Sequence, residues 1–442
     1  MMSQIATNST DDVLPAWLLK VQSAGREQFA TVGLPTGKEE AWRFTKIQPI
    51  LRTRFAPAEP ADGSNLHGQY TFGNEAGVEI VFVNGHFSPE LSKLGDLPVG
   101  VTVTTLADAA SGPLAELAQQ HFGSLINVKK HPFAAWNSAE ANDGVFVHIR
   151  RSVTVEQPIH FLFISVGSGS PTVSHPRILA IAEENSEATF VESFVGEGGT
   201  YLTNAVSEYV VADDARIDHC KLQQEAIGAY HIAAMQVKIG KQTQFVSHAI
   251  NIGAAISRND LAVHLGGRGG YATLNGLVLV GGDQHCDNHT LLDHAAPDCP
   301  SHELYKHVLS GKASAVFKGQ IHVHQIAQKT NAKQSSKALL LSDTADMNSM
   351  PALEIYADDV KCTHGCTVGP IDEDLIFYLR SRGVSYEAAR HLLTYAFAAD
   401  VTRRIRVEPV RRRVEDYMAA QHGLPQDIRI NDLGAFDEAV TR

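Results

Sequence analysis

Short apolar runs broken by turn residues fill the middle of the chain. Between about residues 146 and 369, runs of four to seven residues rich in Val, Ile, Thr, Leu and Phe are separated by Gly, Asp or Asn, and helical periodicity is nearly absent. Examples are GVFVHI, SVTV, HFLFISV and TFVESFV. This pattern predicts a long all-β core and a mostly β protein.

The near-even spacing of these runs favours a β-solenoid, in which each coil pairs with the next. A β-sandwich or a double cupin barrel stays open, because periodicity alone does not separate these folds. A helix of hexapeptide repeats is disfavoured, since the chain has no sustained hexad. The end coils of a solenoid carry unpaired N–H and C=O groups, so we expect the flanking segments or another subunit to cover them.

The N-terminal segment has a different sequence pattern, which is helical at first and then mixed. Residues 12–33 place apolar side chains at helical spacing, and Thr36 with Glu39 forms a capping box that predicts a second helix. Short strands and two further short helices are expected before residue 145. We therefore expect an N-terminal α/β domain over residues 1–145, ahead of a β core over residues 146–369.

The C-terminal flank, residues 370–442, is again helical in pattern. DEDLIFYLRSRG has acidic residues in its first turn, SYEAARHLLTYAFAADVTRRI starts with Ser385 as N-cap, and EPVRRRVEDYMAAQHG ends at Gly423. The second of these helices has a wide apolar surface, for which burial against the other helices is favoured over contact with a partner. The segment is expected to form a helical C-terminal domain.

Composition and charge narrow the classes of function. The chain has 49 acidic and 37 basic residues and a net charge of −12, which argues against nucleic acid as a partner. The start, MMSQIATNSTDD, has neither a basic nor an apolar region, and no apolar run approaches the length of a membrane span, so we expect a cytoplasmic protein without a membrane partner. Five scattered cysteines favour reduced thiols over disulfides.

Three candidate motifs carry little chemistry. GLPTGKEE has too few residues between its glycines for a phosphate loop and Glu39 where Ser or Thr must hold magnesium, so the chain is not expected to be an NTPase. His322 and His324 have cupin-like spacing, but no glutamate follows, which favours ordinary alternating strand residues. Zinc-ligand spacing is also lacking in a group that we interpret as polar residues stacked in coil corners: His285, Cys286, His289, His294, Cys299 and His302.

The strongest chemical signal is DDVKCTHGCTVG, residues 358–369, where Cys362, His364 and Cys366 alternate. On an extended strand these side chains share one face, about 7 Å apart. Thiolate and imidazole together suit iron, zinc or an iron–sulfur cluster, although the two upstream aspartates would raise the thiol pKa. Since too few ligands are present to close a four-ligand site, another chain completes it, or the residues are structural, a buried Cys and a His that hydrogen-bonds a turn.

This stretch carries a family resemblance. PALEIYADDVKCTHGCTVGPIDEDLIFYLRSRGVS closely resembles the signature of the SufB/SufD family of iron–sulfur cluster assembly proteins, and GLPTGKEEAWRFT and HCDNHTLLDHAAPDCPSHELYKHVLSGKASAVFKGQIHV are similar to further family motifs. Only residues 58–130 and about the last dozen lack such a match. The SufD branch is favoured, because SufB proteins carry a long cysteine-bearing insertion and an E-H-E-A-T-T stretch where this chain reads KCTHGCT.

The resemblance implies a fold and partners. It implies a right-handed parallel β-helix core that pairs with SufB, and C-terminal helices that bind the ATPase SufC. The family histidine implicated in assembly, which faces a SufB cysteine, falls on His364, and a neighbouring family cysteine falls on Cys362. At Cys366 the chain departs from the family, which usually has Ala there, so a buried small residue is favoured.

The function implied is a non-catalytic scaffold subunit of the Suf complex. His364 and Cys362 would transiently hold iron or a nascent cluster, and SufB thiolates would complete the coordination. Two other functions stay open: a purely structural adaptor between SufB and SufC, and a β-helix enzyme acting on carbohydrate, for which the chain lacks a visible ladder of paired carboxylates. Whether isolated chains form a homodimer and whether the complex binds a reduced flavin are also left open.

Overall fold

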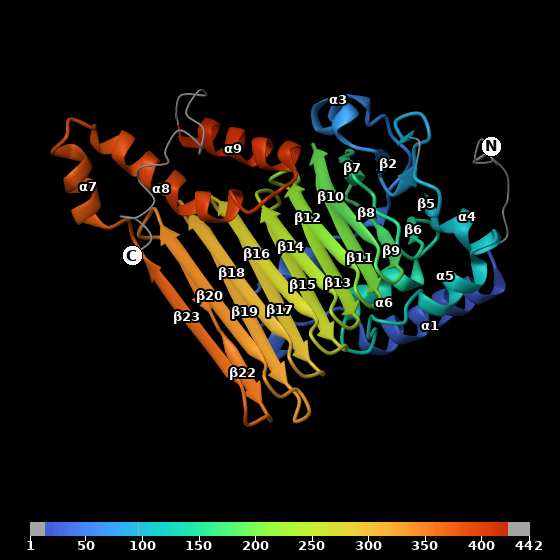
Figure 1. Cartoon of the computed structure of the whole chain (residues 1–442). Coiled ribbons are helices and arrows are strands. Elements are labelled where there is room, and N and C mark those ends of the chain that lie inside the picture. The colour runs from blue at the N-terminus through green and yellow to red at the C-terminus, as the bar shows by residue number, and fades with distance from the viewer. Residues whose placement is uncertain (1–13, 96, 423–442) are drawn as a thin grey trace.

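The computed structural model describes residues 14–95 and 97–422 (Figure 1). The expectations for the first twelve residues and for the helix end at Gly423 lie outside these residues. The described N-terminal part contains helices α1 (Ala16–Val32), η1 (Glu40–Trp42), α2 (Gln48–Arg52), α3 (Ser64–Tyr70), η2 (Gly73–Glu75), α4 (Leu106–Ser111), α5 (Ala115–His121) and α6 (Pro132–Ala139), and strands β1 (Ala56–Pro57), β2 (Val78–Val83), β3 (His86–Phe87), β4 (Lys93–Leu94) and β5 (Val101–Thr105).

Strands dominate the middle of the molecule. They are β6 (Val145–Ile149), β7 (Ile159–Val166), β8 (Thr172–Ser174), β9 (Arg177–Ala182), β10 (Glu187–Glu197), β11 (Tyr201–Val211), β12 (Arg216–Gln224), β13 (Tyr230–Ile239), β14 (Gln244–Asn251), β15 (Ile256–Leu265), β16 (Tyr271–Val280), β17 (His285–His294), β18 (Pro300–Leu309), β19 (Ser314–Val323), β20 (Asn331–Leu340), β21 (Asp346–Ser349), β22 (Ala352–Ile355) and β23 (Lys361–Gly369). Helices α7 (Glu373–Arg380), α8 (Tyr386–Thr402) and α9 (Glu408–His422) follow.

The strands form two parallel stacks. In the described chain, sheet A has the order β21-β19-β17-β15-β13-β11-β9-β6-β5, and sheet B has the order β23-β20-β18-β16-β14-β12-β10-β7-β2-β3. Successive strands of the core alternate between the sheets, so each coil adds one strand to each stack (Figure 1). This winding confirms the predicted parallel β-solenoid and excludes the sandwich and the barrel.

Apolar rows fill the interior between the sheets. The rings of Phe82, Phe163 and Phe194 stack in one row, with centroids 5.5 and 5.0 Å apart. Strand β7 is buried on both faces and reads as a near-continuous apolar run, whereas β17 and β19 alternate between buried interior residues and half-buried outer residues over their second halves. One coil here is 29 residues long, since His264 and Asp293 are 29 residues apart in sequence and pair in register on neighbouring strands.

The C-terminal helices cover the outer face of sheet B. Helix α8 contacts β16 and β18, and its buried Tyr395 and Val401 pack in one cluster with Ile250, Leu277 and Val308 of the sheet. Ser385 caps α8 as predicted, since its hydroxyl accepts a hydrogen bond from the Ala388 N–H. The apolar surface of α8 is therefore mostly buried, but against the sheet as well as against the neighbouring helices.

The capping box at Thr36 forms, but the helix predicted after it does not. The Thr36 N–H donates to the Glu39 carboxylate at 2.9 Å, and only the 3₁₀ turn η1 follows. The Arg258 guanidinium stacks 3.9 Å from the centre of the Trp42 ring and donates a hydrogen bond to the Ala41 carbonyl. That carbonyl is thus used by a tertiary contact, which ends the helix after one turn.

Several other expectations concern the whole chain. No helix in the described residues is long and apolar enough to cross a membrane. The five cysteines are all free thiols, as their number and spacing predicted. Strands β2 and β5 of the N-terminal part hydrogen-bond to β7 and β6 and so extend the two sheets. The division into domains 1–145, 146–369 and 370–442 stays a prediction.

Candidate functional site

Strand β23 carries Cys362, His364 and Cys366 at the last coil of the solenoid. It pairs in parallel with β20, so that His364 lies in register with Gln334. The alternation of a strand places the three side chains on one face, as predicted. That face continues the inward rows of sheet B, because Cys362 packs against the interior cluster.

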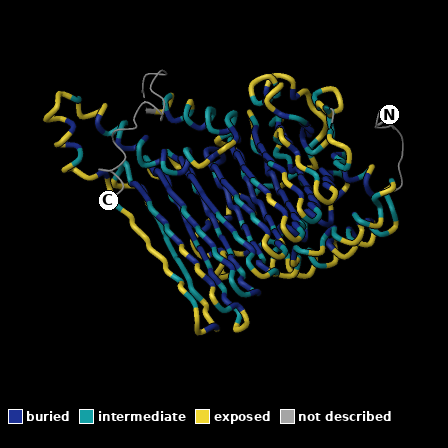
Figure 2. Tube along the Cα trace, viewed as in Figure 1, coloured by how far each residue is buried: buried dark blue, intermediate teal, exposed yellow. Residues whose placement is uncertain are grey.

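This inward face is open to solvent at β23. His364 and Cys366 are exposed and Cys362 is half-buried, whereas Gln334, one coil earlier in the same row, is buried. The reason is topological, since β23 ends the strand order of sheet B and has β20 as its only neighbour among the described strands. Figure 2 shows the last strand as an exposed edge beside a buried sheet. His364 is therefore not sealed inside the solenoid, and the choice between a functional and a structural role for these residues stays a prediction.

The local chemistry of the thiols is modest. Burial raises the pKa of the Cys362 thiol, and a hydrogen bond with the Ala332 backbone only partly offsets this effect. The sequence had suggested Asp358 and Asp359 as the cause of a raised pKa, but neither contributes to the shift. In the free chain Cys362 is thus mostly a neutral thiol at neutral pH.

The three residues of β23 do not form a closed metal site. Within the described residues, one group of three or more His, Cys, Asp or Glu side chains brings its ligand atoms within 4.8 Å of one another, and that group lies elsewhere. The ligand atoms of Cys362, His364 and Cys366 are not brought this close together. The arrangement can at most hold part of a coordination shell, with the remaining ligands supplied from outside the chain.

A buried polar pair lies behind His364, which the sequence did not indicate. Gln334 donates a hydrogen bond of 2.6 Å to the Glu303 carboxylate in the preceding coil. Burial raises the pKa of Glu303 to about 7, although the hydrogen bond from Gln334 favours its charged form. The inward row that ends at His364 therefore contains a carboxyl group able to gain or lose a proton near neutral pH.

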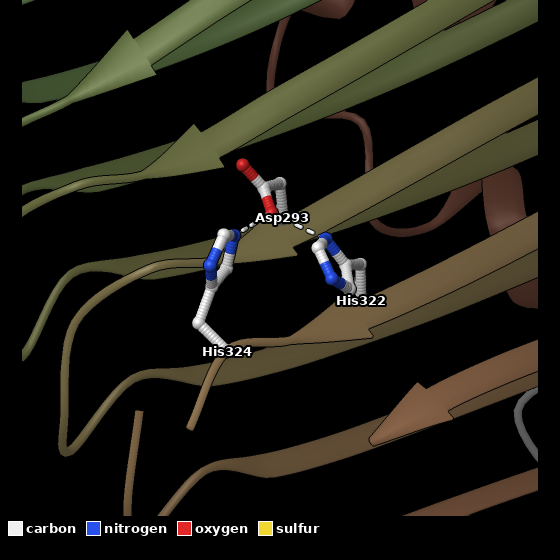
Figure 3. A group of neighbouring side chains, drawn as sticks. All are labelled: Asp293, His322 and His324. Carbon is white, nitrogen blue, oxygen red and sulfur yellow. Dashed lines mark hydrogen bonds and ion pairs between the residues drawn. The ribbon is translucent and has the colours of Figure 1, made fainter. Parts of the chain in front are cut away.

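The structure also places the other histidines and cysteines that the sequence analysis considered as metal ligands. His322 and His324, disfavoured for want of a carboxylate, both bond to Asp293 of the preceding coil (Figure 3). The stretch from His285 to His302 forms no metal site within the described residues. Its members lie mostly on β17 and β18, with Cys286 buried inside, and not in coil corners as the sequence suggested.

Comparison with known proteins agrees with this architecture. The model for the SUF system FeS cluster assembly SufBD core domain matches residues 163–397, and the model for the SufBD protein N-terminal region matches residues 6–161. The two matches together cover most of the solenoid and the segment ahead of it.

Curated relatives extend over nearly the whole chain. An iron–sulfur cluster assembly SufBD family protein of Synechocystis sp. is 30% identical over 431 residues, which cover 95% of this chain and 94% of the relative. The iron–sulfur cluster assembly protein SufD of Escherichia coli K12 is 30% identical over 391 residues, 88% of this chain and 89% of the relative. SufD of Bacillus subtilis is 27% identical over 321 residues, 71% of this chain and 72% of the relative. The chain belongs to the SufBD family of iron–sulfur cluster assembly proteins.

Proposed function

We propose that the chain is a cytoplasmic, non-ATPase scaffold subunit of the Suf complex. It pairs with SufB through the solenoid core and binds the ATPase SufC through the helices that follow residue 370. ATP hydrolysis then resides in SufC, and this chain contributes binding surfaces and metal ligands. The family membership supports the general role in cluster assembly.

The open edge of β23 is the observation that carries the proposal. A parallel strand with one neighbour leaves a row of unpaired N–H and C=O groups on its other side, which favours addition of another strand. An apolar side chain, that of Val368, is exposed on β23 itself. These features are expected of a surface that a partner subunit covers.

His364 and Cys362 are the proposed ligands for iron or a nascent cluster. They share one face of β23, and their row opens at the end of the solenoid. Imidazole and thiolate are ligands for iron, but two or three donors leave an iron–sulfur cluster unfinished. Thiolates of SufB complete the coordination when its strand lies along β23. Cys366 is exposed on the same face rather than buried, so it is available as a third donor.

The proposal predicts that His364→Ala lowers cluster yield without breaking the complex. The variant removes a ligand and leaves the backbone of β23 in place. Anaerobic iron and sulfide analysis of the complex co-purified with SufB and SufC measures the yield. Thr363→Ala, on the same strand with its side chain on the opposite face, is the matched control and should keep the yield of the parent chain.

Two outcomes would count against the proposal. An unchanged cluster yield for His364→Ala in an intact complex would identify the chain as a structural adaptor. Failure of the unmodified chain to co-purify with SufB and SufC would overturn the scaffold role itself.

A further inference from the structure

A group of side chains of metal-ligating types lies on the outer face of sheet A, on the other sheet from β23. Asp293 is near the end of β17, His322 near the end of β19, and His324 follows β19 directly. Figure 3 shows both imidazoles turned toward the carboxylate. One oxygen of Asp293 bonds to His322 Nδ1 at 3.0 Å and to His324 Nε2 at 2.8 Å.

The coil length brings these residues together. Asp293 pairs in register with His322 on one side and with His264 on the other, and each step spans 29 residues. Glu354 of β22 continues the row beside His322. Imidazole and carboxylate thus alternate across adjacent strands of a rigid stack, and the row is fixed before any ligand arrives.

The distances suit a metal ion with angles near 90°. Two metal–ligand bonds of about 2.1 Å that meet at a right angle place their ligand atoms about 3.0 Å apart. The contacts of Asp293 with the two imidazoles lie within 0.2 Å of this value. Two imidazoles and one carboxylate on one side of an ion leave further positions open, as in sites of divalent iron and related metals.

The surroundings hold the three ligands in place. His264 Nδ1 bonds to the second oxygen of Asp293 at 2.7 Å, which fixes the carboxylate plane. The Tyr356 ring meets the His322 ring edge-on, with centroids 5.7 Å apart. The backbone of His324 is tied on both sides, since its N–H donates to the His294 carbonyl and its carbonyl accepts from the Ala327 N–H.

The group is reachable from solvent, and in the described part of the chain the side chains bonded to its carboxylate are imidazoles, those of His264, His322 and His324. The exposed fractions of the side chains are 22% for Asp293, 29% for His322 and 42% for His324. Burial opposes the charge of Asp293, but hydrogen bonds and charges from His264 and His324 outweigh it and lower its pKa to about 2.

We propose that Asp293, His322 and His324 bind one divalent first-row transition-metal ion, with His264 as a positioning residue for Asp293. On binding, each coordinating nitrogen offers its lone pair, and the proton that it donated to Asp293 moves to the other ring nitrogen or to solvent. Ring nitrogen and carboxylate oxygen favour iron, cobalt, nickel or zinc over magnesium or calcium. The proposal is independent of the role of β23.

The test uses the untagged full chain with the ligands of β23 removed. In a Cys362→Ser, His364→Ala, Cys366→Ser background, chelator-treated protein is titrated with Co²⁺ and followed by calorimetry and visible absorption. We expect one equivalent to bind with new absorption bands in the visible range, and Mg²⁺ not to displace it. Asp293→Asn and His324→Gln should each lose tenfold or more in affinity, and His264→Gln about tenfold.

Two controls make the result decisive. His302→Gln changes a partly exposed histidine of sheet B and should bind Co²⁺ like the background. Circular dichroism identifies any variant that fails to fold, and His324→Gln serves as the second variant because its side chain is the more exposed. The proposal would be overturned if the background chain had no stoichiometric site, or if Asp293→Asn and His324→Gln bound Co²⁺ as tightly as the background chain does. Either result would hold whatever the cluster yield of the Suf complex.

Discussion

Two residues in one row show how position decides the role of a side chain. Gln334 and His364 occupy the same inward row one coil apart, yet the first is buried and the second exposed. The reason is that β20 is paired with a strand on each side in the sheet, whereas β23 is paired on one side among the described strands. The same row contains Glu303, whose carboxyl group is fully enclosed and is bonded to Gln334.

Glu303 leads to a prediction on pH and stability. The pKa of Glu303 is about 7 in the fold and near its ordinary value of 4.5 in the unfolded chain. Between these values the folded state binds the proton more tightly, so the free energy of unfolding falls as pH rises from about 4.5 to about 7. Glu303→Gln removes this titration, worth on the order of 3 kcal/mol.

Urea unfolding midpoints at pH 5 and pH 8 measure this effect. The midpoint should fall less between the two pH values in Glu303→Gln than in the parent chain. Glu116→Gln changes an exposed carboxylate and should behave like the parent. A variant with the same loss of stability toward pH 8 as the parent would show that Glu303 is already ionised in the fold.

The sequence predicts some of these residues and not others for a physical reason. Alternation along one strand is local, so the shared face of Cys362 and His364 could be predicted from spacing alone. The partnership of Asp293 with His322 depends on the length of a whole coil, and turns of different length shift the register. With the coil period of 29 residues in hand, the pair could have been found by searching one period upstream.

At the scale of elements, β23 differs from β18 and β20 of the same sheet because one of its two edges is not paired with a described strand. The Lys361 N–H donates to the Thr330 carbonyl of the neighbouring coil, and a parallel strand points alternate residues to opposite sides. The backbone groups of His364 and Cys366 therefore point away from β20, toward the open edge. This edge is neither short nor blunted by proline, which are the usual protections against strand addition.

A proline on the open side of β23 tests whether a partner strand pairs there. Cys366→Pro removes one outward N–H and keeps the inward hydrogen bonds of its neighbours, because proline is tolerated on an edge strand. We expect tenfold or more weaker binding to SufB, measured by co-purification and by titration of the two subunits. Cys366→Ala loses the thiol, keeps the N–H, and should bind SufB normally. Equal binding by the proline variant would exclude pairing at this position.

At the scale of the molecule, the architecture was more predictable than the packing. The short strands, the solenoid and the capped helix α8 follow from local patterns that the structure confirms. The docking of α8 on sheet B and the early end of the helix after Thr36 depend on contacts far apart in sequence, such as that between Trp42 and Arg258. The sequence pattern of a segment does not indicate which distant part of the chain its residues will contact.

The exposed side of α7 predicts where the ATPase binds. Phe377 is 73% exposed and Tyr378 is 49% exposed, on a helix whose other face packs against α8. Large aromatic side chains are common anchors of protein interfaces. Phe377→Ala should weaken SufC binding by tenfold or more in a pull-down or calorimetric titration, with little change in the thermal midpoint. Ile227→Ala changes an apolar residue of similar exposure, 67%, in a solenoid turn and is the control. An equal effect of both substitutions would remove α7 from the interface.

The open last coil has a consequence for how an ion would enter and leave. If a second subunit stacks its own coil on β23, His364 passes from the outside of one molecule to the inside of a pair without any motion of this chain. An ion captured there would be caged from water, and its exchange with solution would require the two subunits to separate. Such a gate needs no lid, only a force that parts the stacked coils.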